Sequence, residues 1–357
     1  MHKPLAFRIL LGTAGAFALS PAYAEEPIDV VASFSILADM VEQVGGNHVA
    51  VTSLVGPDSD THVFSPSPTH ARALTEADLV VFNGLQFEGW MERLIDSSDY
   101  DGPLVMSTEG IDTLAYHGHA HEHDEHGHDG HEEDAHGHDD HDDHAEQEGD
   151  EHGHGDRDPH AWQNLALSEV YVTNIRDGLI EADPDNADVY RLNAERYIQE
   201  IETANAKIHS MLSEIPDDTA VVTGHDSFGY FANAYGIRFL SPAGLSTEVD
   251  PSAADMAQLI DVIRDQDIKA LFHESMTNPT TIDQLAEETG VPIAGTLYAD
   301  ALASEGDAST YLGMMHHNAN VLYEALAEPG HDDGEREHSH DDDHDHDHDD
   351  DDHGHSH

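Results

Sequence analysis

The sequence predicts an α/β protein with two lobes joined by one long helix. Two observations favour this class: short apolar segments alternate with helical segments in both halves of the chain, and residues 186–215 between the halves have the pattern of one continuous helix. Strands separated by helices form parallel sheets with helices on both faces. A cleft between two such halves is a natural ligand site. An ordinary packed helix would give the same pattern at 186–215, so that alternative stays open.

The first half of the chain carries four apolar segments that we expect to be strands. A helical pattern follows the first segment and ends at Gly45-Gly46, and the second segment ends at Gly56-Pro57. The expected strands are residues 28–33, 49–55, 79–83 and 104–106. The expected helices are residues 36–44, 67–75, 88–96 and 167–182.

The second half repeats this alternation after the long helix, near whose start lies Pro184. The expected strands are residues 220–223, 238–240, 270–272 and 293–297, and the expected helices are 227–235, 253–266, 280–290 and 309–327. We therefore expect an N-terminal lobe at residues 25–183, a linking helix at 184–215, a C-terminal lobe at 216–328 and a tail at 329–357.

The composition excludes several classes of function. The chain has 74 acidic residues, 13 basic residues and a net charge of −61, so nucleic acid and anionic membranes would repel it. It has no cysteine, which excludes a disulfide framework, a cysteine zinc finger, a thiol nucleophile and a lipid-anchored N-terminal cysteine. Its 32 histidines point to a divalent metal ion.

The first 24 residues have the pattern of a cleavable secretory signal peptide. Lys3 and Arg8 precede an apolar stretch at residues 9–19, and Ala22-Tyr23-Ala24 has small residues around the expected cleavage site. The apolar stretch is shorter than the ~20 residues that cross a bilayer. We expect cleavage near Ala24-Glu25 and a soluble protein in the Gram-negative periplasm.

Two tracts are dominated by histidine and acidic residues. Residues 117–156 hold thirteen histidines and sixteen acidic residues, and residues 331–357 hold nine histidines and thirteen acidic residues. Such segments bury too little apolar surface to offset the entropy of ordering, so we expect disorder without metal. Our hypothesis is that they bind additional Zn²⁺ weakly and pass it to the cleft or sense its excess. The alternative is that they only solvate the protein.

Four side chains have the placement expected of metal ligands. His62 lies in a loop after an expected strand, His160 follows the first tract, His225 follows the strand at 220–223, and Asp300 follows the strand at 293–297. Open parallel sheets place ligands at the ends of strands. Three imidazoles and one carboxylate suit a tetrahedral Zn²⁺ ion. The main rival ligand is His273, beside the end of another strand.

Several motifs resemble those of the cluster A-I solute-binding proteins of zinc and manganese ABC importers. They are FSILAD at 34–39, THVFSP at 61–66, DPHAW at 158–162, GHDSFGYF at 224–231, ESMTNP at 274–279 and YAD at 298–300. The resemblance implies two (βα)4-like lobes, a rigid linking helix and one metal ion held between the lobes by His62, His160, His225 and Asp300. It also implies delivery of this ion to an ABC permease in the inner membrane, and we expect a monomer.

Ligand chemistry favours Zn²⁺ over Mn²⁺ as the cargo. Imidazole suits zinc, whereas manganese favours carboxylate and carbonyl oxygen. Manganese-binding relatives typically have a carboxylate at the third position, where this chain has His225. The alternatives are a manganese-binding member of the family and a periplasmic zinc buffer or metallochaperone that uses the tracts. A zinc hydrolase is disfavoured because the chain lacks His-Glu-x-x-His and four protein ligands leave no place for water.

Overall fold

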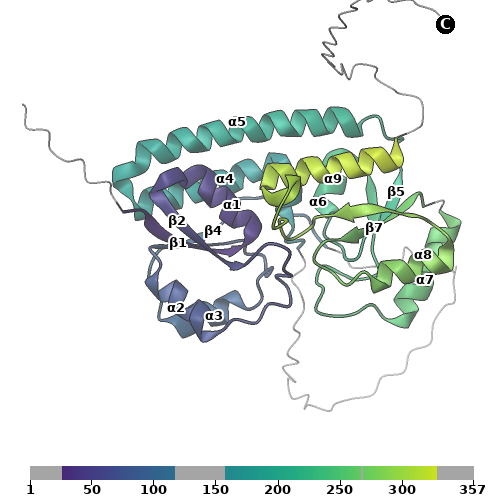
Figure 1. Cartoon of the computed structure of the whole chain (residues 1–357), viewed down its shortest axis with the longest axis horizontal. Helices are drawn as coiled ribbons and strands as arrows, with labels where there is room; N and C mark the ends of the chain where they lie inside the picture. The colour runs from purple at the N-terminus through teal and green to yellow at the C-terminus, as the bar shows by residue number, and fades with distance from the viewer. Residues whose placement is uncertain (1–25, 117–156, 267, 328–357) are drawn as a thin grey trace, which may run out of the picture.

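The structure is a computed structural model that describes residues 26–116, 157–266 and 268–327. It contains two four-stranded parallel sheets with helices packed against them, which form two lobes side by side along one long helix (Figure 1). The predicted α/β class is therefore confirmed. The expected signal peptide and both histidine-rich tracts lie outside the described residues.

The sheet of the N-terminal lobe has the strand order β2-β1-β3-β4, and all three pairings are parallel. Because the strands are parallel, their carboxyl ends meet at one edge of the sheet. The strands are β1 (Ile28–Phe34), β2 (Val49–Val55), β3 (Leu79–Phe82) and β4 (Leu104–Met106), and the helices between them are α1 (Ser35–Gly45), α2 (Pro68–Glu76) and α3 (Met91–Ser98).

The sheet of the C-terminal lobe has the corresponding order β6-β5-β7-β8 and is also parallel. Its loops therefore repeat the arrangement of the first lobe. The strands are β5 (Ala220–Val222), β6 (Arg238–Leu240), β7 (Ala270–Glu274) and β8 (Ile293–Leu297), and the helices are α6 (Gly229–Tyr235), α7 (Ala253–Asp265), α8 (Thr280–Thr289) and α9 (Tyr311–Leu326).

Two helices connect the lobes, α4 (Leu165–Ala182) and α5 (Ala187–Leu212). The predicted long helix is a single helix, although it is shorter than residues 186–215, because a 3₁₀ turn at Pro184–Asn186 precedes it and tighter turns follow Leu212. Helix α5 contacts α1 and α4 along one part of its length and α9 along the other, so it lies along both lobes (Figure 1).

The predicted helix at 88–96 begins three residues late, at Met91. The sequence pattern was misleading here because Glu88 is not a helical surface residue. Its carboxylate is buried and accepts hydrogen bonds from the backbone N–H groups of Asn83 and Gly84 at 2.7 and 3.2 Å. Residues 83–90 therefore form an irregular segment at the carboxyl end of β3.

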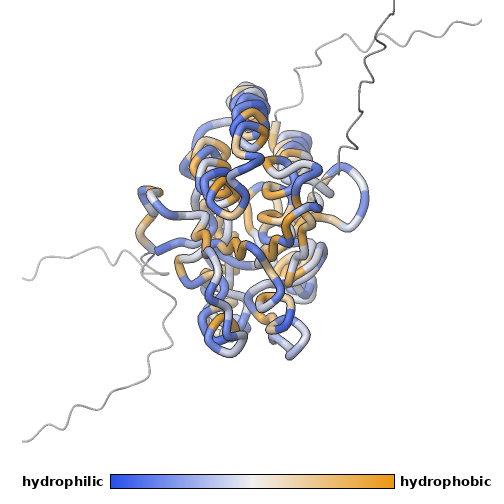
Figure 2. Tube along the Cα trace, turned by 90° about the vertical axis from the view of Figure 1, so that its left-hand side faces the viewer, coloured by the Kyte–Doolittle hydropathy of each residue, from blue (hydrophilic) through white to orange (hydrophobic). Residues whose placement is uncertain are grey.

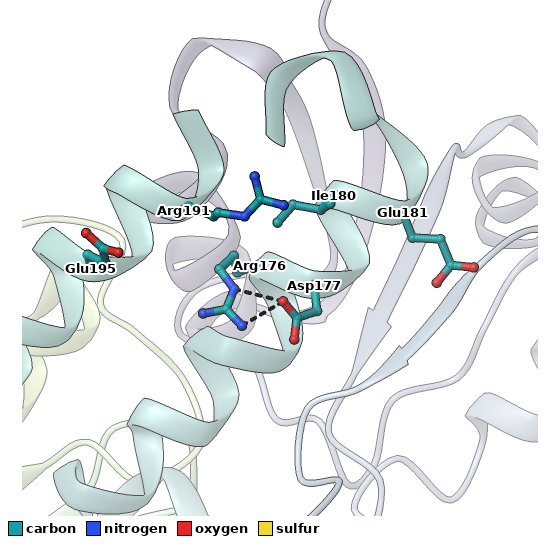
Figure 3. A pocket seen from close by; sticks show the side chains of 6 residues that line it. All are labelled: Arg176, Asp177, Ile180, Glu181, Arg191 and Glu195. Atoms are coloured by element: carbon teal, nitrogen blue, oxygen red, sulfur yellow. Dashed lines mark hydrogen bonds and ion pairs between the residues drawn. The ribbon is translucent and has the colours of Figure 1, made fainter. Parts of the chain in front are cut away.

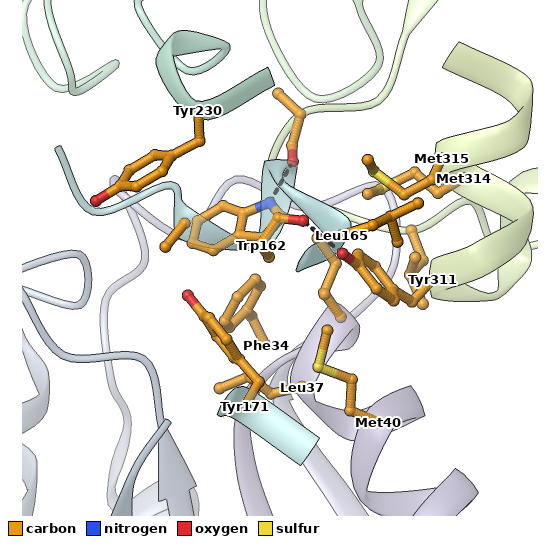
Figure 4. Close-up of a cluster of buried hydrophobic side chains, with 14 of the residues drawn as sticks. Phe34, Leu37, Met40, Trp162, Leu165, Tyr171, Tyr230, Tyr311, Met314 and Met315 are labelled. Carbon is orange, nitrogen blue, oxygen red and sulfur yellow. Dashed lines mark hydrogen bonds between the residues drawn. The ribbon is translucent and has the colours of Figure 1, made fainter. Parts of the chain in front are cut away.

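One apolar core continues from the N-terminal lobe through the connecting helices into the C-terminal lobe. Hydrophobic positions gather toward the middle of the molecule in Figure 2. Trp162 lies within this core, fully buried, and its indole N–H donates to the carbonyl of Ala299 at 2.9 Å (Figure 4). Its own carbonyl accepts a 2.5 Å hydrogen bond from Tyr311 of α9. The lobes are thus joined by a packed interface as well as by α5. Among the described helices, none is both long and apolar enough to cross a bilayer.

Replacing Gly178 of α4 by alanine is expected to destabilise the protein. A Cβ atom at this position would lie 2.2 Å from Cγ2 of Val105 in β4. Overpacking should therefore lower the free energy of unfolding by about 1–3 kcal/mol, although alanine forms helices better than glycine. Denaturant unfolding of the two proteins measures the difference.

The matched control is the same substitution in a Val105→Ala background, where the obstructing methyl groups are absent. There the new methyl group occupies free space, and Gly178→Ala should raise the free energy of unfolding by up to about 1 kcal/mol. An equal loss of stability in both backgrounds would contradict the packing explanation.

Candidate metal centre

The four side chains selected from the sequence lie together between the lobes. One ligand atom from each of His62, His160, His225 and Asp300 lies within 4.8 Å of the others. His62 follows β2, His160 precedes a short 3₁₀ turn before α4, His225 follows β5 and Asp300 follows β8. Two ligand positions therefore come from each half of the chain, and all four side chains are buried.

The loop that carries His62 is held against the C-terminal lobe by two aspartates. Asp58 has a left-handed backbone (φ 54°), and its carboxylate accepts a hydrogen bond from the backbone of Ser304 at 3.0 Å. Asp60 accepts the backbone N–H of His62 at 2.9 Å and the hydroxyl of Thr247 at 2.6 Å. These contacts cross between the lobes and bring His62 toward Asp300.

A neighbouring carboxylate orients the ring of His160. Oδ1 of Asp158 accepts the backbone N–H of His160 at 2.9 Å and lies 2.7 Å from its Nδ1 atom. A carboxylate at this position favours the proton on Nδ1 and leaves the lone pair of Nε2 free to face the other ligands. The Asp-x-His spacing of the DPHAW motif places both groups in one turn.

Glu274 at the end of β7 performs the same role for His225. Its Oε2 atom lies 2.5 Å from Nδ1 of His225, and its Oε1 atom accepts the backbone N–H groups of Gly224 and His225 at 2.7 and 2.9 Å. This carboxylate was not among the functional residues predicted from the sequence. Its position is the signal that could have identified it: Glu274 ends β7, which pairs with β5, the strand that precedes His225.

His273 does not belong to the cluster, so the expectation that it rivals the other ligands is wrong. Successive side chains of a strand point to opposite faces, so His273 points away when Glu274 points inward. Nε2 of His273 instead lies 3.0 Å from Asp283 of α8, and both side chains are partly exposed.

The centre contains five buried polar atoms that no group outside the centre satisfies by a hydrogen bond, which are the Nε2 atoms of His62, His160 and His225 and both carboxylate oxygens of Asp300. The Oδ2 atom of Asp300 lies 3.3 Å from Nε2 of His62 and 3.1 Å from Nε2 of His225. Its Oδ1 atom lies 3.8 Å from Nε2 of His160. Ligands of a tetrahedral zinc ion lie about 3.3–3.6 Å apart, because each bond is about 2.0–2.2 Å long. The donor set therefore fits a small divalent ion.

The protonation states of the ligands are coupled through Asp300. Burial lowers the pKa of His62, and the nearby carboxylate only partly opposes it. Burial also opposes charge on His225, but the carboxylates of Glu274 and Asp300 outweigh it and hold the pKa of His225 well above its ordinary value. Burial would raise the pKa of Asp300, yet the adjacent His225 and His160 hold it well below its ordinary value. The cluster without metal thus favours an anionic Asp300 beside a protonated His225.

A separate surface pocket of about 460 Å³ lies between α4 and α5 and contains none of these four residues (Figure 3). Charged side chains dominate its lining, and Arg176 is already paired with Asp177 at 2.7 Å. No residue selected from the sequence lines it, so it is not a rival for the metal centre.

Comparison with known proteins places the chain in a family. Residues 30–325 match the family described as zinc-uptake complex component A, periplasmic. The manganese-binding lipoprotein MntA of Halalkalibacterium halodurans is 30% identical over 305 residues, which cover 85% of this chain and 90% of that relative. The manganese-binding lipoprotein MntA of Bacillus subtilis is 31% identical over 312 residues, which cover 85% of this chain and 91% of that relative.

Solved structures agree with this assignment over both lobes. The periplasmic zinc-binding protein TroA from Treponema pallidum has a TM-score of 0.71 and 25% identity, covering 85% of this chain and 100% of that chain. A manganese-bound periplasmic metal-binding protein from Candidatus Liberibacter asiaticus has a TM-score of 0.66 and 25% identity, covering 83% of this chain and 98% of that chain.

The family match spans most of the described residues, including both sheets and the helices that connect them. Proteins of this kind are not enzymes: they bind a metal ion outside the cytoplasm and deliver it to the membrane permease of an ABC importer. The chain belongs to the zinc-uptake complex component A family of metal ABC importer substrate-binding proteins.

Proposed function

We propose that this protein captures Zn²⁺ through His62, His160, His225 and Asp300 and delivers it to its permease. The observation that carries the proposal is the set of three imidazole nitrogens and one carboxylate, all buried, facing one another and not satisfied by any group outside the centre. Zinc accepts this set in tetrahedral geometry. Two of the imidazoles are oriented by carboxylates, which raises their basicity as ligands.

A manganese-binding role is the second candidate. Two relatives with 30 and 31% identity are named as manganese-binding, and this sequence similarity favours Mn²⁺. The donor set favours Zn²⁺, because manganese prefers oxygen ligands and higher coordination numbers, and because zinc lies above manganese in the Irving–Williams order. The two candidates therefore predict opposite orders of affinity for Zn²⁺ and Mn²⁺, which a competition titration measures.

The remaining parts of the proposal concern segments outside the described residues, the boundaries of the lobes and the oligomeric state. We propose that residues 1–24 are a cleavable signal peptide for export to the periplasm, and that residues 117–156 and 331–357 bind further Zn²⁺ weakly. A lobe boundary on each side of the linking helix, at residues 184–215, and a monomeric state also stay proposals. Comparing zinc uptake at low zinc with and without the two tracts tests their role in capture.

Replacing His225 by alanine should abolish tight zinc binding. The site would lose one of its four ligands and would leave Glu274 without its imidazole partner. Zinc titration against a strong chelator measures the effect, using a variant that lacks residues 117–156 and 331–357 so that the tracts do not contribute. The parent of that variant should bind one Zn²⁺ tightly and retain it in excess Mn²⁺.

The matched control is His273→Ala, which removes the neighbouring histidine that lies outside the cluster. This variant should bind zinc like its parent. Loss of tight binding in His273→Ala but not in His225→Ala would overturn the assigned site. Replacement of bound Zn²⁺ by stoichiometric Mn²⁺ would favour the second candidate, and absence of any tight site in the shortened parent would move the function into the tracts.

Zinc binding at pH 7 should release a proton from the protein. The pKa of His225 is raised in the metal-free state, and zinc binds only a neutral imidazole, so the ion must displace this proton. Affinity should therefore fall as the pH drops below that raised pKa, by about tenfold per pH unit for each displaced proton. Calorimetric titration in buffers of different ionisation enthalpy measures the number released.

Glu274→Gln tests the physical cause of this proton release. The amide keeps the shape of the side chain but removes the negative charge beside Nδ1 of His225, so the pKa of His225 should fall and fewer protons should be released at pH 7. Asp283→Asn makes the equivalent change beside His273 and should leave proton release as it is. Equal proton release in the Glu274 variant and the parent would contradict the explanation.

A further inference from the structure

Phe87 is the aromatic residue that contacts the metal centre most directly. Its ring lies edge-on to the imidazoles of His62 and His160, with centroid distances of 4.9 and 5.8 Å. On its other side it packs against Phe34 and Trp162 at 5.0 and 4.7 Å. The side chain is only 2% exposed. Phe87 therefore connects two ligands to the rigid core between the lobes.

The three histidines are not held in the same way. Nδ1 of His160 is paired with Asp158, and Nδ1 of His225 is paired with Glu274. Within the residues that the structure describes, Nδ1 of His62 has no hydrogen-bond or ion-pair partner. The backbone of His62 is fixed by Asp60. Its imidazole contacts Asp300 through Nε2 at 3.3 Å, and on the Nδ1 side, where the other two histidines meet a carboxylate, ring packing limits its rotation.

The backbone that presents Phe87 is strained. Gly84, Leu85 and Gln86 have positive φ values of 89°, 55° and 62°. A left-handed conformation costs a non-glycine residue roughly 1–2 kcal/mol, so two in succession need compensation. The buried carboxylate of Glu88 supplies it by accepting hydrogen bonds from the backbone of residues 83 and 84 and from the hydroxyl of Ser33 at 2.6 Å. Strain that the surroundings enforce in this way often marks a functional position.

We propose that Phe87 is the positioning residue for His62 and, through it, a determinant of metal specificity. The ring of Phe87 takes the place of the carboxylate that orients each of the other two histidines. With His62 held at the tetrahedral position, the site excludes additional water ligands and disfavours ions such as Mn²⁺ that require more of them. This inference rests on the proposed function, because it takes His62 to be a ligand.

The test is the substitution Phe87→Leu in the full-length mature protein, with and without His62→Ala. Phe87→Leu should weaken Zn²⁺ binding at the tight site by about 10–100-fold, the usual range for a residue that orients a metal ligand. The ratio of Zn²⁺ to Mn²⁺ affinity should fall with it. Co²⁺ bound at this site should lose the intense visible absorption of tetrahedral coordination. In the His62→Ala background, Phe87→Leu should change the affinity by less than about threefold, because the ligand it orients is absent.

Phe34→Leu is the matched control, since Phe34 is buried like Phe87 and also packs against Trp162, but among the described residues its ring contacts are with Phe87 and Trp162 and not with an imidazole of the centre. It should keep the zinc affinity within about threefold of the parent and retain the tetrahedral cobalt spectrum. If Phe87→Leu does not fold, Phe87→Met removes the flat ring with little loss of volume and takes its place.

The outcomes separate this inference from the proposed function. Equal effects of the Phe34 and Phe87 variants, an unchanged cobalt spectrum in the Phe87 variant, or an undiminished effect of Phe87→Leu in the His62→Ala background would each overturn the positioning role. If His62→Ala itself leaves tight zinc binding unchanged, the proposed ligand set fails instead.

Discussion

The burial of five polar atoms that no group outside the metal centre satisfies is the constraint on which the arrangement of this protein depends. An unpartnered carboxylate or imidazole nitrogen is costly to bury, and the cost is largest where water is excluded. The fold tolerates it because each lobe brings ligands from loops at the carboxyl edge of its own sheet, and because a continuous apolar core around Trp162 holds the lobes together. A divalent cation would compensate the carboxylate charge and accept the lone pairs of the three imidazoles.

The groups that surround the ligands orient them in two ways, through charged hydrogen bonds and through packing. Asp158 and Glu274 orient two imidazoles through hydrogen bonds, and the charge of Glu274 also raises the pKa of His225. His62 has only its backbone tied to a carboxylate, and an aromatic ring limits its side chain. Because the loop of His62 also contacts the opposite lobe through Asp58 and Asp60, this ligand is the one most directly linked to the relative position of the lobes.

The sequence was sufficient for much of the fold because strands and helices carry their own periodicity. The strands at 49–55, 104–106, 238–240 and 293–297 were predicted with the bounds that the structure has. The helix predicted from residue 88 was misplaced, because the buried environment of Glu88 and the left-handed residues before it follow from contacts with Ser33 and the backbone at 83–84, which no local pattern encodes. His273 was likewise a reasonable candidate from sequence alone. Its position on β7, one residue from Glu274, directs it to the opposite face.

By itself, the sequence determined the class of fold, the four candidate ligands and the family, since these depend on residue types, their order and their spacing. Tertiary structure alone decided that the four side chains converge, that Glu274 and Asp158 orient two of them, and that Phe87 packs against the third. The physical reason is the distance along the chain: His62 and Asp300 are separated by most of the protein, and their atoms come within 3.3 Å only because parallel strands in two lobes end at a common interface. Local propensity acts over a few residues, whereas the electrostatics of a metal centre depend on groups brought together by packing.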